Sequence, residues 1–136
     1  MSRQLNKQMG NLGEKIIIQN LLEKGMYYER INSYFDLLVE YKHRVEIKTA
    51  LISKKNRFQR HVGKFCFNKD FHVNTYKENG VWVCFMGRYR EDFINFGLIE
   101  SNKLTDKKSY TIHGVCRLPL LSFDQWCEKI SYESDK

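Results

Sequence analysis

The 136-residue sequence contains one proline and eight glycines, which is too few for a collagen-like or proline-rich chain. It has no apolar run near the roughly 18 residues that a membrane-spanning helix needs. The N-terminal stretch MSRQLNKQMGNLGEK lacks the apolar core and small-residue cleavage site of a secretory signal. We therefore expect a cytoplasmic protein without a membrane span.

Metal-binding cysteine patterns are also missing. The chain has four cysteines with no CxxC pair and no Cys/His cluster of the kind that binds zinc, namely Cys66, Cys84, Cys116 and Cys127. We expect reduced thiols. Cys84 lies in an apolar run and is predicted to be buried in a strand.

Acidic residues are fewer than basic ones, 16 against 23, so the formal net charge is +7. This excess favours an anionic partner, with nucleic acid first and an acidic membrane surface second. A merely solvated surface explains the same number. Hydrophobic residues make up 42% of the chain, enough for a packed core, and residues 1–136 are expected to form a single domain.

The first strong element is a helix predicted from Asn11 to Lys24, with Asn11 as its N-cap and Gly25 just after its end. The helical spacing places Glu14 on the same side as three apolar residues, Ile18, Leu21 and Leu22. Glu14 at this position is either a helix cap or a side chain directed to a site.

Short apolar or alternating segments predict strands at 26–31, 34–40, 44–50, 64–68, 81–86 and 93–99. Residues 70–77 predict a short helix, and the polar segment 54–63 predicts a loop or short helix. A final helix is expected to begin at Ser122 with Gln125 in the capping-box position and Trp126 and Ile130 facing the core. This order predicts an α/β or α+β domain with a mixed sheet.

The most informative residues are Asp36, Glu46 and Lys48. Strand geometry places Glu46 and Lys48 on one face, with Ile47 directed to the other. A hairpin turn centred near Lys42 would pair Asp36 roughly with Lys48 and leave Glu46 diagonal to it. Two carboxylates and a lysine would then project together from a hydrophobic sheet.

Charges on a mostly buried face must be paired or must bind metal. Two adjacent carboxylates, together with the Ile47 carbonyl, offer the oxygen ligands that Mg²⁺ prefers. Lys48 would then orient or deprotonate a water, or stabilise charge on a phosphate. The alternative is an ordinary strand face with a cross-strand ion pair.

Asp36, nine residues, then Glu46-Ile47-Lys48 within the apolar segment VEIKTA resembles the motif of the PD-(D/E)XK nuclease superfamily, with Phe35 in place of the proline. That family has the restriction-endonuclease-like fold and includes archaeal Holliday-junction resolvases. The later segments VWVCFMG and INFGLIES are similar to the back half of its small members, whereas the linking helix has only a weak counterpart in residues 64–77.

The resemblance covers roughly residues 11–100 and implies an α/β fold with a mixed central sheet flanked by helices. It also implies a catalytic set of Asp36, Glu46, Lys48 and Glu14. Asp36, Glu46 and Glu14 would bind Mg²⁺ or Mn²⁺, with the Ile47 carbonyl as a further ligand.

No acidic residue occurs between Ile47 and Lys69. This stretch holds the residues that we expect to contact nucleic acid, namely Lys54, Lys55, Arg57, Arg60, His61 and Lys64. The alternative is a solvated loop. His61 could be catalytic, but a lone loop histidine is more often a phosphate contact or has no role.

The sequence thus predicts a Mg²⁺-dependent DNA endonuclease, such as a Holliday-junction resolvase-like or nicking enzyme, that acts as a homodimer to cut two strands. One alternative is a non-catalytic nucleic-acid-binding protein on the same fold. Another is an adaptor whose basic face docks an acidic protein.

Overall fold

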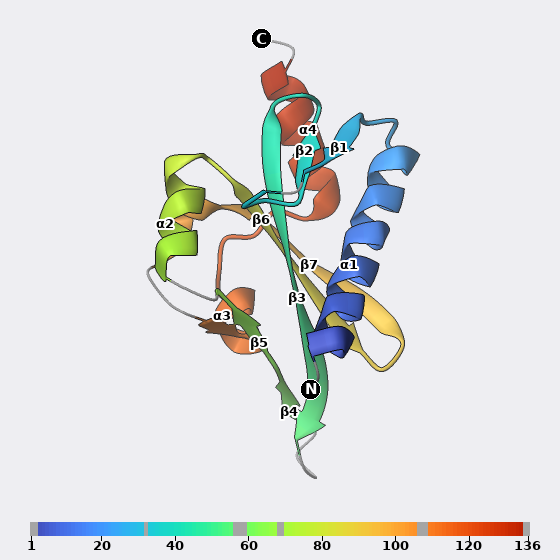
Figure 1. The fold of residues 1–136 in the computed structure, drawn as a ribbon, viewed down its shortest axis with the longest axis vertical. Coiled ribbons are helices and arrows are strands. Elements are labelled where there is room, and N and C mark those ends of the chain that lie inside the picture. The colour runs from blue at the N-terminus through green and yellow to red at the C-terminus, as the bar shows by residue number, and fades with distance from the viewer. Residues whose placement is uncertain (1–2, 32, 56–59, 68–69, 106–108, 135–136) are drawn as a thin grey trace.

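The computed structural model describes residues 3–31, 33–55, 60–67, 70–105 and 109–134 (Figure 1). Its main sheet has the strand order β1-β2-β3-β6-β7. The strands of that order are β1 (Tyr28–Arg30), β2 (Leu37–Val39), β3 (His43–Lys55), β6 (Trp82–Tyr89) and β7 (Asp92–Glu100). β3 and β6 are parallel and the other neighbours are antiparallel, so the sheet is mixed and the predicted α/β class is confirmed.

Two short pairings extend the sheet system. β4 (Arg60–Val62) pairs with the far end of β3, and β5 (Lys64–Cys66) pairs with β8 (Ser109–Thr111). The helices are α1 (Arg3–Glu23), α2 (Asp70–Glu78), α3 (Ile112–Cys116) and α4 (Phe123–Ser134), with a 3₁₀ turn at Ser101–Lys103. In the part of the chain that the structure describes, no helix is both long and apolar enough to cross a membrane.

β6 is the strand around which both layers of the core form. Its residues alternate between two apolar clusters: Trp82, Cys84 and Met86 belong to one, and Val83 and Phe85 to the other. The α1 face is the side that Ile17, Leu21, Trp126 and Ile130 of α1 and α4 cover. The α2 face is the side that Tyr76, Ile112 and Val115 of α2 and α3 cover. The predictions of a central strand at 81–86 and of a buried Cys84 are confirmed.

The parallel pairing of β3 with β6 requires a crossover, because a tight turn can join only antiparallel strands. Helix α2 provides it, and α1 and α2 lie on opposite sides of β3 in Figure 1. The short helix predicted at 70–77 is confirmed as α2, and the strand predicted from residue 64 is confirmed as β5, so the helix between β3 and β6 is better formed than the weak counterpart expected at 64–77.

Helix α1 begins at Arg3, so the prediction of Asn11 as its N-cap was wrong. Its end was predicted correctly. Gly25 has φ +69°, and the N–H groups of Gly25 and Met26 donate to the Leu22 and Leu21 carbonyls at 3.0 Å each, which is the Schellman pattern.

The buried stripe of α1 also differs from the prediction. Leu21 is fully buried, whereas Leu22 is 54% exposed. Gly13 lies so close to β3 that an added Cβ would be 2.7 Å from the Thr49 hydroxyl. Because α1 approaches β3 this closely at Gly13, the side of the helix that faces the sheet is formed by Gly13, Ile17 and Leu21.

The hairpin of β2 and β3 has a different register from the predicted one. Leu37 pairs with Val45 and Val39 with His43, and the turn places Glu40 and Tyr41 at φ 51° and 63°. Two positive φ values are the signature of a type I′ turn, usually made by Asn-Gly. Tyr41 stacks on Tyr27 with ring centroids 4.1 Å apart, which holds this turn in place.

Segment 54–63 was predicted as a loop or short helix, and its described residues other than Gly63 form strands instead. β3 continues to Lys55, and β4 returns beside it with Lys54 opposite His61. Residues 56–59 lie outside the described residues.

The C-terminal helix follows the prediction. The Ser122 N–H donates to Gln125 Oε1 at 2.9 Å and the Gln125 N–H donates to Ser122 Oγ at 3.1 Å, which completes the capping box. Trp126 and Ile130 are fully buried. β8 and α3 were not predicted.

Candidate active site

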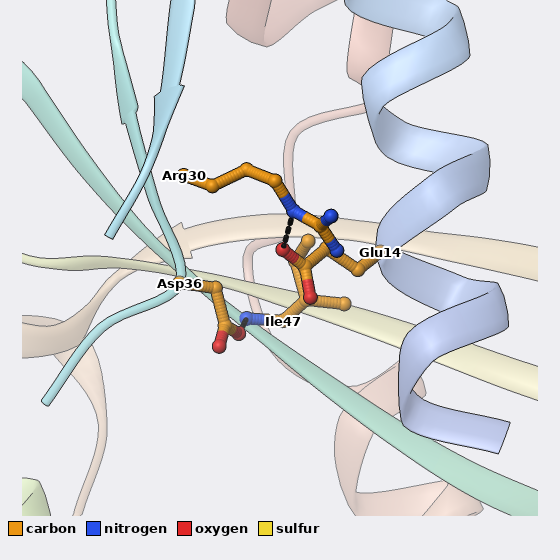
Figure 2. Close-up of polar contacts among 4 residues, drawn as sticks. All are labelled: Glu14, Arg30, Asp36 and Ile47. Atoms are coloured by element: carbon orange, nitrogen blue, oxygen red, sulfur yellow. Dashed lines mark hydrogen bonds and ion pairs between the residues drawn. The ribbon is translucent and has the colours of Figure 1, made fainter. Parts of the chain in front are cut away.

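Asp36 lies where β2 begins to pair with β3. The observed register pairs Leu37 with Val45, so the predicted register, in which Asp36 pairs with Lys48, was off by two residues. The Asp36 N–H donates to the Val45 carbonyl at 3.0 Å, and Asp36 Oδ2 accepts the Ile47 N–H at 2.8 Å (Figure 2). The Asp36 carboxylate thereby accepts the β3 N–H that a backbone carbonyl of a neighbouring strand would otherwise accept, and this hydrogen bond fixes the side chain.

Glu46 is buried on the α2 face, between Val45 and Ile47, which both pack on the α1 face. The Tyr76 hydroxyl donates to Glu46 Oε2, and Glu46 also forms a side-chain hydrogen bond with Asp36. The pKa of Glu46 is raised from 4.5 to about 9. Burial of the carboxyl group is the largest cause, followed by the hydrogen bond with Asp36 and the negative charge of Asp36. Lys48 and Tyr76 oppose this shift. At neutral pH the Glu46 carboxyl group is therefore protonated.

Asp36 and Glu46, called the carboxyl pair below, fit a hard divalent cation by their chemistry. A buried carboxyl group (Glu46) beside a half-buried one (Asp36) needs either a proton or a cation to relieve the repulsion between them. The N–H and C=O of one strand residue leave the strand on the same side, so the Ile47 carbonyl points toward the edge that Asp36 occupies. Two carboxylates, one carbonyl and several waters are a usual ligand set for Mg²⁺.

Lys48 follows Glu46 on the same face, as predicted. Its Nζ lies 5.3 Å from the centre of the Phe67 ring and 5.9 Å from that of Tyr76. These two ring faces attract the ammonium and hold it beside the carboxyl pair.

Glu14 is placed differently from the other three predicted catalytic residues. It lies in the middle of α1, so its alternative role as a helix cap was wrong. It projects toward β3 but is held by Arg30 of β1, with Arg30 Nε 3.1 Å from Glu14 Oε1 (Figure 2). Among the described residues, no three His, Cys, Asp or Glu side chains gather closely enough to hold a metal ion, so Glu14 is not joined to the carboxyl pair.

Arg30 is a site residue that the sequence did not indicate. Its pKa is raised first by the hydrogen bond to Glu14 and by that residue's charge, and in lesser part by the charge of Asp36. A guanidinium between two acidic side chains, 56% exposed, is a suitable contact for a phosphate. A lone arginine before a loop gives no pattern by which it could have been found.

The predicted nucleic-acid contacts lie on the β3–β4 hairpin and beyond it. Lys54 and Lys55 end β3, and Arg60 and His61 begin β4, but their side chains and all of Arg57 lie outside the described residues. Lys64 is exposed on β5. Along an extended strand, Lys54 follows Lys48 at roughly 20 Å. The β3–β4 hairpin therefore lies further along β3 from the carboxyl pair, at the lower end of that strand in Figure 1.

The arrangement can bind a divalent cation, place an ammonium group beside it and offer a guanidinium to an anion. No family model, curated protein or solved structure matches this chain. The geometry of the site is therefore the basis for its function.

Proposed function

We propose that this chain is a metal-dependent endonuclease that hydrolyses phosphodiester bonds in DNA. The observation that carries the proposal is the placement of Asp36 against Glu46, with Lys48 two residues further along the same strand and face. This is the arrangement that the resemblance to the PD-(D/E)XK superfamily implies.

We also propose the restriction-endonuclease-like fold. Three features support it: the leading helix α1, the antiparallel run β1-β2-β3 that carries the motif, and the crossover through α2 to the parallel strand β6. The proposal of this fold rests on the order of these elements together with the Asp36, Glu46 and Lys48 motif.

The chemistry follows from the residues in place. Asp36, Glu46 and the Ile47 carbonyl would hold Mg²⁺ or Mn²⁺. Such a cation supplies charge stabilisation at the phosphate and lowers the pKa of a water. Lys48 donates a hydrogen bond that orients the attacking water or stabilises the charge that develops on the phosphate.

Arg30 binds a phosphate oxygen of the strand being cut, and Glu14 keeps the guanidinium directed toward the edge of β3. The basic residues of the hairpin bind neighbouring phosphates without reading bases. The described residues form one such site, so we propose that a homodimer cuts the two strands of a duplex or a junction.

The test is a cleavage panel of supercoiled, linear, single-stranded and four-way-junction DNA with and without Mg²⁺. We expect the wild type to cut at least one substrate only with Mg²⁺, and Asp36→Ala to abolish cutting. Asp92→Ala, which removes an exposed acid of β7, is the matched control and should keep full activity. Cleavage by Asp36→Ala equal to that of the wild type would contradict the proposal, and salt-sensitive binding without cleavage would favour a non-catalytic nucleic-acid-binding protein.

A further inference from the structure

Tyr76 of helix α2 contacts both reactive side chains of β3. It is 1% exposed, its hydroxyl donates to Glu46 Oε2, and its ring centre lies 5.9 Å from Lys48 Nζ. Neither the motif nor the spacing of the sequence includes this residue, because α2 reaches β3 only through the crossover.

We propose that Tyr76 is a positioning residue that sets the orientation of the Glu46 carboxyl group and the Lys48 ammonium; this rests on the proposed nuclease function. The hydroxyl occupies Oε2, so the carboxyl plane of Glu46 is fixed while it also bonds Asp36. The ring, with Phe67 as its partner, limits the positions that Lys48 Nζ can take.

The hydroxyl of Tyr76 lies directly behind Glu46, the proposed metal ligand, because it donates to Oε2 of that side chain. Partners of this kind, behind a metal ligand, typically change metal affinity or activity by about 10–100-fold when removed.

A second tyrosine provides the comparison that separates positioning from packing. Tyr110 is 4% exposed and its ring lies 6.1 Å from that of Phe67, while the Tyr76 ring lies 6.4 Å from it. The Tyr110 hydroxyl, however, bonds the exposed residue Thr105, whose N–H donates to it at 2.9 Å. The two residues share the aromatic cluster and differ in where the hydroxyl points.

The experiment compares Tyr76→Phe with Tyr110→Phe in the full chain. Mn²⁺ binding is measured by calorimetry without DNA, and kcat and KM are measured on the best DNA substrate. We expect Tyr76→Phe to bind Mn²⁺ about 10-fold more weakly and to lose about 10-fold in kcat at unchanged KM. Tyr110→Phe should match the wild type in Mn²⁺ affinity, kcat and KM. Thermal unfolding checks that both variants are folded.

Equal Mn²⁺ affinity and equal kcat in the two variants would overturn the positioning role. A fall in kcat with a parallel rise in KM and a lower melting temperature would also overturn it, because loosened packing causes that pattern. In both cases an active wild type leaves the nuclease function standing. A wild type that neither binds Mn²⁺ nor cuts DNA overturns the nuclease function and the positioning role together.

Discussion

The two faces of the central sheet bury polar atoms in different ways. On the α1 face, Thr49 Oγ1, Asn95 Nδ2 and Trp126 Nε1 are buried without a hydrogen-bond partner among the described residues, and Ser101 Oγ, in the 3₁₀ turn that packs against α2, is a fourth such atom. On the α2 face, the Glu46 carboxyl group has both Asp36 and Tyr76 as partners. Most of the unpaired buried groups therefore lie on the α1 face, whereas the connected polar contacts of Asp36, Glu46 and Tyr76 lie on the α2 face. Fully partnered buried groups are held in one geometry, which chemistry requires.

The largest effect should follow the loss of Lys48. We expect Lys48→Ala to reduce cleavage by about 10²–10⁴-fold, because a positioned proton donor or acceptor contributes on that scale. Stability should change little, since the lysine is half-buried and its loss leaves the two rings packed. Single-turnover cleavage measures the rate, with the exposed Lys103→Ala as control. Activity within threefold of the wild type would remove Lys48 from the site.

On the α1 face a mutation should affect stability instead. Leu21→Ala removes a fully buried side chain and should cost about 2–5 kcal/mol of unfolding free energy. Leu22→Ala, at the neighbouring and mostly exposed position, should cost far less. Urea unfolding of both variants measures the difference. Mn²⁺ affinity of the folded Leu21→Ala protein should equal that of the wild type, and a large loss would show that the faces are not independent.

The raised pKa of Glu46 predicts a pH dependence of stability in EDTA. The folded state keeps a proton that the unfolded state releases between pH 4.5 and about 9, so stability should fall as pH rises through this window. The slope is at most about 1.4 kcal/mol per pH unit for one proton. Glu46→Gln cannot titrate and should flatten the curve. Urea midpoints at several pH values test this, and identical slopes for the two proteins would contradict it.

The smallest effects concern two ion pairs whose basic side chains are exposed. Arg30 contacts Glu14 at 3.1 Å and Lys24 contacts Asp124 at 2.8 Å. Neither Arg30→Ala nor Lys24→Ala should shift the melting temperature measurably. Arg30→Ala should lower the salt dependence of DNA binding by about one phosphate contact, whereas Lys24→Ala should leave it unchanged. Equal salt slopes for the two variants would remove Arg30 from the DNA contact.

The sequence was sufficient where the signal is local. The apolar run of β6, the capping box at Ser122 and the Glu46-Ile47-Lys48 strand all follow from neighbouring residues and were confirmed as elements. The pairing of that strand was not local. Its register depends on a turn in which Glu40 and Tyr41 adopt left-handed backbone conformations and Tyr41 stacks on Tyr27. The residue types in this turn do not predict such a conformation.

The parts of the site that were missed are long-range contacts. Tyr76 and Glu46 are 30 positions apart, and Arg30 and Glu14 are 16 apart. Only the crossover through α2 and the packing of β1 beside α1 bring these pairs together. The start of α1 was missed for another reason: residues 3–10 are mostly polar and show no apolar period.

The central claim is that the carboxyl pair binds a divalent cation. A calorimetric titration of Mn²⁺ into the wild type and into Asp36→Asn tests it without any substrate. We predict one binding site per chain in the wild type and at least a 10-fold loss of affinity in Asp36→Asn. No binding to the wild type at millimolar Mn²⁺, or equal binding to both proteins, would contradict it.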